Sequence, residues 1–218
     1  MTSRILVLGA TGQTGIDFSN AALEAGHQLT LYVRNPSKVP ENIKSHEKVS
    51  IVEGQLSDEE KLKQAVASGA TVFVSFAGPT FGSTGTPVSD SLKLLLPLLI
   101  SHNYQRAIIT ATCSYTAPED QGGLKWRAVV GLIRLIGGSA YHEIQGIGAQ
   151  VTSQDPAKLK WTLIRLPFLD NGDAKHVTAT FTGSGKDGLF LSRKSAAAWV
   201  LDQLDSEEWV GKCPALCN

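Results

Sequence analysis

The feature that most constrains the fold of this chain is a short apolar run that ends in three evenly spaced glycines. Together they form the sequence RILVLGATGQTG, from Arg4 to Gly15. Four consecutive apolar residues before a glycine are typical of a strand that is buried on both faces, as the strands of a parallel sheet are. Beyond the glycines, apolar residues recur at helical spacing from Ile16 to Ala25, and Gly26 is a typical helix stop. The glycines therefore lie on a tight turn from a buried strand into a helix.

The same alternation of strand-like and helix-like segments continues along the chain. The polar segment 36–48 is either a short helix or a loop with a turn. Ser57, with Glu60 three residues later, forms a capping-box pattern, so we expect a helix to begin there. Strands are predicted at 5–8, 29–33, 49–53, 71–77, 106–112, 161–166 and 189–192, and helices at 16–25, 57–68, 89–102, 124–136, 139–151 and 196–204.

This order of segments predicts an α/β fold, a single Rossmann-like, doubly wound parallel sheet with helices on both faces. Strands separated by helix-length stretches favour parallel pairing with right-handed crossovers. The 218 residues suit one such domain and leave little room for a second, so residues 1–218 are expected to form one domain. In such a sheet the ligand lies outside the carboxyl ends of the strands, where the strand order reverses.

Composition and charge disfavour several kinds of partner. The chain has 20 basic and 20 acidic residues and no block of five basic residues, so neither nucleic acid nor an anionic membrane is an expected partner. The apolar run 91–100 is too short to cross a bilayer and is interrupted by Lys93 and Pro97. Three cysteines without matching histidine ligands predict neither a metal site nor a structural disulfide, and without a signal-peptide pattern we expect a cytoplasmic protein.

The glycine turn is suited to binding a pyrophosphate. Glycine permits a tight turn and lets a ligand approach the backbone, and the helix that follows offers free N–H groups at its positive end. The spacing Gly9-x-x-Gly12-x-x-Gly15 differs from the common dinucleotide pattern G-x-G-x-x-G. A plain tight turn between a strand and a helix is the alternative interpretation of the glycines alone.

The residue after the second strand indicates which dinucleotide is bound. Proteins that bind NAD carry an acidic residue about 20 positions beyond the glycines, where it contacts a ribose hydroxyl. Here that place is taken by Arg34, with Lys38 four residues later. A guanidinium binds a phosphate in a bidentate manner, whereas a carboxylate would repel it. We therefore expect NADP(H), although Arg34 would also suit a solvated charge at a strand end.

The residues expected to contact this cofactor follow from the carboxyl ends of the predicted strands and from the turns after them. They are Gly9, Thr11, Gly12, Gln13, Thr14, Gly15, Arg34, Lys38, Gln55, Leu56, Ala77, Gly78, Pro79, Thr112 and Pro167.

Several of these motifs are familiar as a set. The sequences GATGQTG, VRNPS, EGQLSD, FAG and WTLIRLP, each at or after a predicted strand, resemble the atypical short-chain dehydrogenase/reductase superfamily. Within it, the chain is most similar to the NmrA-like group and to the biliverdin reductase B (flavin reductase)-like group. The resemblance covers nearly the whole chain and is weakest at 116–156. It implies NAD(P) binding on this fold, with one departure, because Gln55 stands where the groups usually carry an aspartate that contacts adenine.

The resemblance also suggests where catalytic residues would lie. Many members carry Tyr-x-x-x-Lys, in which the tyrosine protonates a carbonyl oxygen and the lysine activates the tyrosine. In this chain the similar segment is YHEIQ, where Tyr141 is present but Gln145 replaces the lysine. The candidate catalytic residues are therefore Tyr141 and, after the fifth strand, Ser114, with Thr112 as a second candidate for the serine position.

Three interpretations of function remain open from the sequence. The first is an NADPH-dependent oxidoreductase of the atypical short-chain type that reduces a small flavin-, quinone- or carbonyl-like acceptor, because flavin-reductase-like members manage without Tyr-x-x-x-Lys. The second is an NADP-binding NmrA-like regulator without turnover, and the third is a non-redox isomerase or cyclase on the same fold. The NAD(P)-binding domain is expected to place its substrate-side elements in 115–142 and 168–190, and to act on a small molecule as a monomer or weak homo-oligomer.

Three further residues in this region have both a functional and a structural interpretation. His142 suits a proton relay, but a histidine on a helix surface is the more common case. Cys113 lies at a strand end, and without a neighbouring cation it is expected to be a buried packing thiol. Trp126 would serve equally well as a lid over the substrate or as part of the core.

Overall fold

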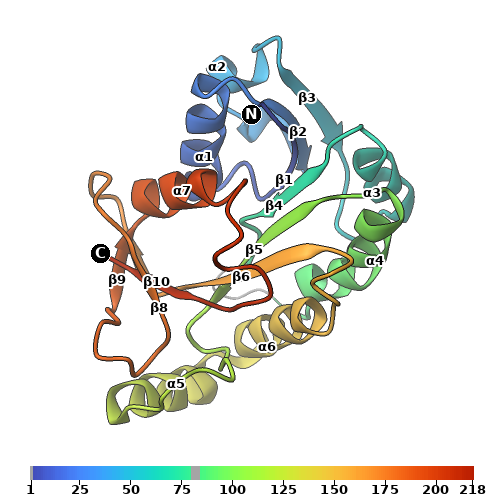
Figure 1. The fold of residues 1–218 in the computed structure, drawn as a ribbon. Helices are drawn as coiled ribbons and strands as arrows, with labels where there is room; N and C mark the ends of the chain where they lie inside the picture. Colours follow the sequence, from blue (N-terminus) through green and yellow to red (C-terminus); the bar gives the residue numbers. More distant parts are fainter. Residues whose placement is uncertain (1, 80–83) are drawn as a thin grey trace.

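The computed structural model describes residues 2–79 and 84–218 (Figure 1). Its main sheet has eight strands in the order β3-β2-β1-β4-β5-β6-β10-β8, and β7 and β9 form a separate parallel pair. The strands are β1 (Arg4–Leu8), β2 (Gln28–Val33), β3 (Val49–Glu53), β4 (Val72–Ser75), β5 (Arg106–Thr112), β6 (Lys160–Leu166), β7 (Phe168–Asp170), β8 (Thr178–Thr180), β9 (Phe190–Ser192) and β10 (Ala215–Cys217). The helices are α1 (Gln13–Glu24), α2 (Glu41–Lys44), α3 (Glu59–Val66), α4 (Pro87–Ser101), α5 (Leu124–Ile136), α6 (Gly138–Thr152) and α7 (Arg193–Asp202), and Pro36–Lys38 forms a short 3-10 turn.

The strand order confirms the predicted doubly wound α/β fold. β1 pairs in parallel with β2 on one side and with β4 on the other, so the order of the strands reverses between β1 and β4. The carboxyl ends of these two strands therefore border the crevice in which such sheets bind ligands. β10 continues the parallel sheet beside β6, but β8 pairs with it in an antiparallel manner.

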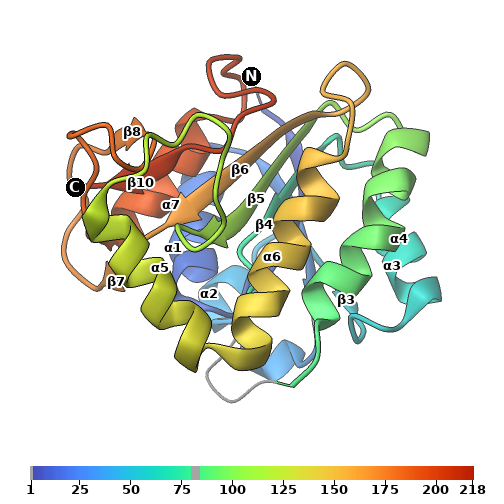
Figure 2. The same cartoon turned by 90° about the horizontal axis from the view of Figure 1, so that it is seen from below.

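Two layers of helices cover the sheet, because the side chains of each buried strand alternate between its faces. Ile5 and Val7 pack on the side of α1, α2 and α7, while Leu6 and Leu8 pack on the side of α3, α4 and α6. Figure 1 shows α1 and α7 on one side of the sheet and α4 and α6 on the other. α5 lies outside these layers, toward β8 and β10 (Figure 2), where Trp126 packs with Cys113 and Ala215.

The structure corrects several details of the sequence interpretation. The N-cap of α3 is Asp58, whose carboxylate accepts a hydrogen bond from the backbone N–H of Lys61 at 3.1 Å, so the expected Ser57 cap is wrong. The predicted strand at 189–192 exists as β9, but it pairs with β7 outside the main sheet. The strand next to β6 is β10, which was not predicted, because its three residues are too few to show a pattern.

The described residues include no helix that is both long enough and apolar enough to cross a membrane.

A buried ion pair joins the sheet to the loop after β5. The guanidinium of Arg165, on β6, is fully buried and binds both oxygens of Asp120, at 2.6 and 2.7 Å. It also donates to the carbonyl oxygens of Tyr115 and Cys213. Burial alone would raise the pKa of the Asp120 carboxyl, but the hydrogen bonds and charge of Arg165 hold that pKa below its ordinary value.

We expect Asp120→Ala to lower the free energy of unfolding by about 3–5 kcal/mol, because the substitution leaves a buried guanidinium without its counter-charge. Urea unfolding followed by circular dichroism measures this loss. The exposed neighbour Glu119 provides a matched control, since Glu119→Ala removes the same charge outside the buried pair.

The pH dependence provides a second check on this prediction. Because the pKa of Asp120 is lower in the folded than in the unfolded chain, its stabilising contribution is complete above the ordinary aspartate pKa of 3.8. The contribution is lost as the pH falls through the lower, folded value. A difference in stability between the wild type and Asp120→Ala that does not shrink on acidification would contradict this account.

Candidate functional site

Two of the three glycines in the turn are required by packing. Gly9 has a φ of +75°, and a Cβ added there would lie 2.6 Å from the backbone nitrogen of Ala77. A Cβ added to Gly15 would lie 2.3 Å from the carbonyl oxygen of Gly9. These contacts bring the start of α1 directly against the end of β1 and the residues after β4. Side chains at these two positions would separate those elements.

Gly12 has a different role, because its surroundings within the protein are open. It is exposed, its φ and ψ of −78° and 156° suit any residue, and a Cβ added there would lie 3.4 Å from Gly9 O. Gly12 is the N-cap of α1 and has no side chain with which to cap the helix, whose first turn contains no acidic residue. The first N–H groups of a helix have no partner within it, and they favour an anion. The turn therefore has the shape and the charge to hold a pyrophosphate.

A cavity of about 360 Å³ lies against this turn, and we refer to it as the glycine-turn cavity. It extends from the end of β1 to the starts of α4 and α6, across the point where the strand order reverses. Its lining consists of Leu8, Gly9, Thr11, Gly12, Tyr32, Val33, Arg34, Lys38, Leu56, Phe76, Ala77, Gly78, Pro79, Pro87, Val88 and Glu143.

A second recess of about 330 Å³, which we name the basic recess, adjoins the first through shared residues. It is lined by Thr11, Arg34, Asn35, Lys38 and Gln55. Arg34 and Lys38 are both exposed, so an anionic ligand in the recess can reach their charged groups. The side chain of Asn35 accepts hydrogen bonds from the N–H and the hydroxyl of Ser37, which shapes the turn between the two cations.

Tyr32 supports the basic recess through Gln55, which is one of its lining residues. Its hydroxyl donates a hydrogen bond of 2.6 Å to the carbonyl oxygen of Gln55, which keeps the Gln55 side chain at the recess. Burial, with a smaller contribution from the charge of Asp58, raises the pKa of Tyr32 to about 12, so the tyrosine remains a hydrogen-bond donor at neutral pH. A Cβ on Gly54 would lie 2.4 Å from the Tyr32 oxygen, so Gly54 is required for this contact.

Glu143 joins the glycine-turn cavity to the helix beside it. Its buried carboxylate accepts hydrogen bonds from the backbone N–H groups of Val88, at 2.6 Å, and Ser89, at 3.3 Å, and so caps α4 from the neighbouring helix α6. Burial raises the pKa of Glu143, although the two backbone hydrogen bonds oppose the shift. Glu143 thereby fixes α6, the helix that carries Tyr141, against the start of α4.

A third cavity, of about 400 Å³ and mostly apolar, shares Pro79 with the glycine-turn cavity. We name it the apolar cavity. Its other lining residues are Thr112, Cys113, Ser114, Trp126, Val129, Leu132, Ile133, Ile136, Gly137, Ala140, Tyr141, Ile144, Leu166, Pro167, Phe168 and Leu189.

The polar side chains of the apolar cavity gather after β5. The hydroxyls of Thr112 and Ser114 form a hydrogen bond of 2.7 Å with each other. The amide of Gln145 donates at 2.9 Å to the carbonyl oxygen of Ser114, so this side chain positions the loop. Burial raises the pKa of Cys113 to about 12, which confirms it as a packing thiol.

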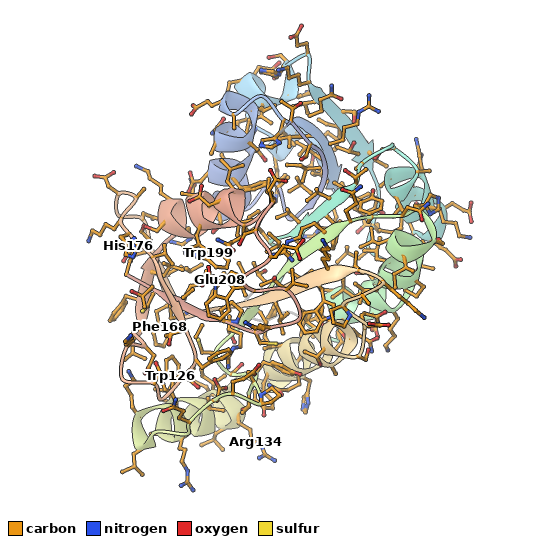
Figure 3. All side chains as sticks on the ribbon, in the orientation of Figure 1. Trp126, Arg134, Phe168, His176, Trp199 and Glu208 are labelled. Carbon is orange, nitrogen blue, oxygen red and sulfur yellow. The ribbon has the colours of Figure 1, made fainter. Side chains whose placement is uncertain are left out.

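The outer wall of the apolar cavity is α5, which an aspartate holds in place. The indole N–H of Trp126 and the ammonium of Lys125 both bind the carboxylate of Asp187, the latter at 3.0 Å. Burial alone would raise the pKa of Asp187, but these two hydrogen bonds lower it to about 2. Figure 3 shows Trp126 and Phe168 in the same region, between α5 and the sheet. Trp126 is thus a buried residue on the cavity lining, as its interpretation as part of the core expected, while its role as a lid stays a prediction.

The structure brings most of the predicted site residues to these three cavities. Tyr141, Ser114, Thr112 and Pro167 line the apolar cavity, while Gln55 lines the basic recess. Gln13, Thr14 and Gly15 line none of the cavities, because Gln13 points to solvent and the other two are buried at the start of α1. Three residues near these cavities were not predicted from the sequence. Tyr32 binds the carbonyl of Gln55, Glu143 caps α4, and Asp187 binds Trp126 of α5.

Comparison with known proteins agrees with this geometry. A family model described as NAD(P)H-binding matches residues 9–207 of the chain. Among curated proteins, the oxidase ucsJ of Acremonium sp is 38% identical over 82 residues, which are 37% of this chain and 23% of that protein. The matched part is thus less than a quarter of that relative's length.

Solved structures share the whole fold at low sequence identity. A short-chain dehydrogenase/reductase from Veillonella parvula, solved in complex with NADP, has a TM-score of 0.79 at 21% identity, covering 100% of this chain and 95% of that one. The anaerobillin reductase ChuY from Escherichia coli O157:H7 has a TM-score of 0.77 at 15% identity, covering 98% and 96% of the two chains. At these identities the likeness establishes the fold.

The glycines give a prediction that separates packing from binding. Gly15→Ala should lower the free energy of unfolding by about 1–3 kcal/mol, because its methyl group overlaps the Gly9 carbonyl. Gly12→Val should fold with wild-type stability but lose affinity for a nicotinamide dinucleotide, since its side chain occupies the open space at the helix N-terminus. Thermal unfolding and fluorescence titration measure the two effects. Unchanged affinity in a folded Gly12→Val variant would show that the turn is purely structural.

Proposed function

The chain belongs to the NAD(P)H-binding family, and on this premise we propose that it is an NADPH-dependent oxidoreductase that reduces a small flavin-, quinone- or carbonyl-like acceptor. The family match over residues 9–207 supports the resemblance to the atypical short-chain dehydrogenase/reductase superfamily. We further propose that residues 1–218 act as one NAD(P)-binding domain, with the elements in 115–142 and 168–190 on the substrate side.

The observation that carries this proposal is the shared wall between two cavities of different character. The glycine-turn cavity suits a dinucleotide. The apolar cavity lies beside it, and Pro79 lines both cavities. A second ligand in the apolar cavity would therefore lie next to the nicotinamide end of a bound cofactor. When bound, the nicotinamide supplies a hydride to an adjacent acceptor.

Three groups of residues would hold the cofactor. The open backbone at Gly12 and the N-terminus of α1 would bind the pyrophosphate. Arg34 and Lys38, which both line the basic recess, would bind a ribose 2′-phosphate, which supports NADPH over NADH. Gln55 lines the same recess, and its side-chain oxygen would accept a hydrogen bond from the adenine amino group, in place of the usual aspartate.

The polar end of the apolar cavity would orient the acceptor. The hydroxyls of Thr112 and Ser114 and the phenol of Tyr141 lie on its lining, and each is able to donate to a carbonyl oxygen. The Gln145 amide donates a hydrogen bond to the Ser114 carbonyl, so it supports the position of Ser114. Because this amide is neutral, it lacks the charge with which a lysine activates tyrosine. We therefore propose that the acceptor takes hydride directly and draws its proton from solvent, with Tyr141 contributing little.

Exchanging the charge at Arg34 tests the choice of cofactor. Arg34→Glu should reverse the preference for NADPH over NADH, because a phosphate contact worth about 1.5–3 kcal/mol is replaced by repulsion. Titration with both nucleotides measures the change, and Lys44→Glu, an equal change of charge at an exposed site outside the recess, is the control. Equal affinity of the wild type for the two nucleotides would refute the assignment.

Removing the phenol hydroxyl tests the route of the proton. In Tyr141→Phe we expect turnover with quinone or flavin acceptors to fall less than about tenfold, whereas a required acid contributes about 10²–10⁴-fold. The assay is NADPH oxidation, with NADPH affinity measured in parallel. A loss within that larger range at intact affinity would make Tyr141 the acid, and tight NADPH binding without oxidation by any acceptor would favour a regulator.

A further inference from the structure

We propose that the apolar cavity selects its acceptor by charge, taking a flat, uncharged aromatic ketone or quinone and rejecting analogues that carry a carboxylate, sulfonate or phosphate. The proposal deepens the function proposed above and rests on it for the role of this ligand as the acceptor. Its physical basis is the composition of the lining, the pairing of Lys125 and Arg165 with carboxylates of the protein, and the hydroxyl groups on the lining.

The lining of the cavity offers apolar contact from several elements. Trp126, Val129 and Ile133 come from α5, Leu166 from the end of β6, and Phe168 from β7. None of the described residues that line the cavity has a charged side chain. An anion buried here would lose its hydration without gaining a partner.

Two cations beside the cavity, Lys125 and Arg165, are paired with carboxylates of the protein. Asp187 is bound by Lys125, at 3.0 Å, and by the indole N–H of Trp126, and its side chain is 4% exposed. Cys113 lies above Arg165, whose guanidinium is bound to Asp120 at 2.6 Å. Neither cation is therefore available to neutralise an acidic ligand. This arrangement differs from the glycine-turn cavity, whose cations Arg34 and Lys38 are exposed.

The hydroxyl pair gives the cavity one polar end. Thr112 and Ser114 share a hydrogen bond of 2.7 Å, and because each hydroxyl has one proton, one of the two protons remains free for a ligand. A carbonyl oxygen is an acceptor that fits this single donor. The rest of a ligand in this orientation would extend among the apolar side chains toward α5.

The reaction that this binding would support is balanced with the cofactor already proposed. The carbonyl carbon of a ketone gains a hydride, the π electrons of its C=O bond move to oxygen, and the oxygen takes one proton from solvent. NADPH is oxidised to NADP⁺, and the ketone is reduced to an alcohol. A quinone takes up the same hydride and proton and becomes a hydroquinone.

The first experiment compares two ligands that differ by one charge, in the absence of cofactor. The probes are 9-fluorenone and 9-fluorenone-2-carboxylate, with affinity measured by calorimetry and by quenching of tryptophan fluorescence. We expect fluorenone to bind about 10- to 100-fold more tightly than its carboxylate. In Trp126→Phe the part of the quenching that arises at the cavity wall should disappear. Equal affinities, or no binding of fluorenone, would overturn the proposal.

A pair of neighbouring substitutions on α5 provides the matched control. Ile136 lines the cavity and is 66% exposed, whereas Leu135 is 82% exposed and is not part of the lining, so both positions accept an arginine without loss of the fold. Ile136→Arg should strengthen binding of the carboxylate at least about fivefold, while Leu135→Arg should leave it unchanged. An equal gain in both variants would show that general surface charge governs binding, and would contradict the proposal.

A separate assay distinguishes failure of this inference from failure of the proposed function. NADPH oxidation is followed with fluorenone and with its carboxylate as acceptors. Selective binding of fluorenone with no oxidation by any acceptor would refute the reductase and leave the charge selection of the cavity established. If NADPH is oxidised equally efficiently with fluorenone and with its carboxylate, the charge selection is refuted and the reductase is supported.

Discussion

The buried ion pair between Arg165 and Asp120 is the interaction on which the wall of the apolar cavity depends. Arg165 projects from β6, and Asp120 belongs to the loop after β5, so the pair ties this loop to the sheet. Asp120 also accepts hydrogen bonds from the backbone N–H groups of Ala117 and Thr182, and the guanidinium reaches the carbonyl of Cys213 before β10. Four segments far apart in sequence thus meet at one charge pair. A buried charge without these partners would be strongly destabilising, which makes the arrangement specific.

The elements organised in this way form the wall of the apolar cavity. The loop that contains Asp120 leads into α5, and the segment that contains Thr182 leads to Asp187, which binds the first turn of α5 through Trp126 and Lys125. The wall helix is therefore attached at one end by polar contacts, while large apolar side chains such as Leu132 and Ile136 remain exposed near its other end. Hydrocarbon exposed at the rim of an apolar cavity is typical of a site that binds an apolar ligand.

The substitution of glutamine for the usual lysine has a structural explanation here. Gln145 donates to the carbonyl of Ser114, and its neighbours Gly146 and Gly148 leave room for Ser89 and Tyr115, whose side chains a Cβ would contact at 2.3 and 2.2 Å. These residues of α6 therefore pack against the loop after β5 and the start of α4. The glycine-turn cavity with its basic recess and the apolar cavity are consequently built by different means, exposed backbone and cations in the first and packed apolar groups in the second.

Local sequence was enough to predict what depends on short-range backbone chemistry. The buried run before Gly9, the spacing of the glycines and the position of Arg34 after the second strand predicted the sheet, its first crossover and a recess with two cations. These features follow from a continuous run of apolar residues and from the absence of a Cβ at two tight contacts, and both can be recognised within about 40 residues of sequence.

The tertiary structure alone decided which distant residues meet. Tyr32 beneath Gln55, Glu143 at the start of α4 and Asp187 beside Trp126 are ordinary polar residues in the sequence, and their roles come from contacts across 23 to 61 positions of the chain. β10 was not predicted for the same reason, since three residues have no periodicity and become a strand only beside β6. Long-range pairing depends on the closure of the whole fold, so the sequence determined the glycine turn and the basic recess, and packing determined the shape of the apolar cavity.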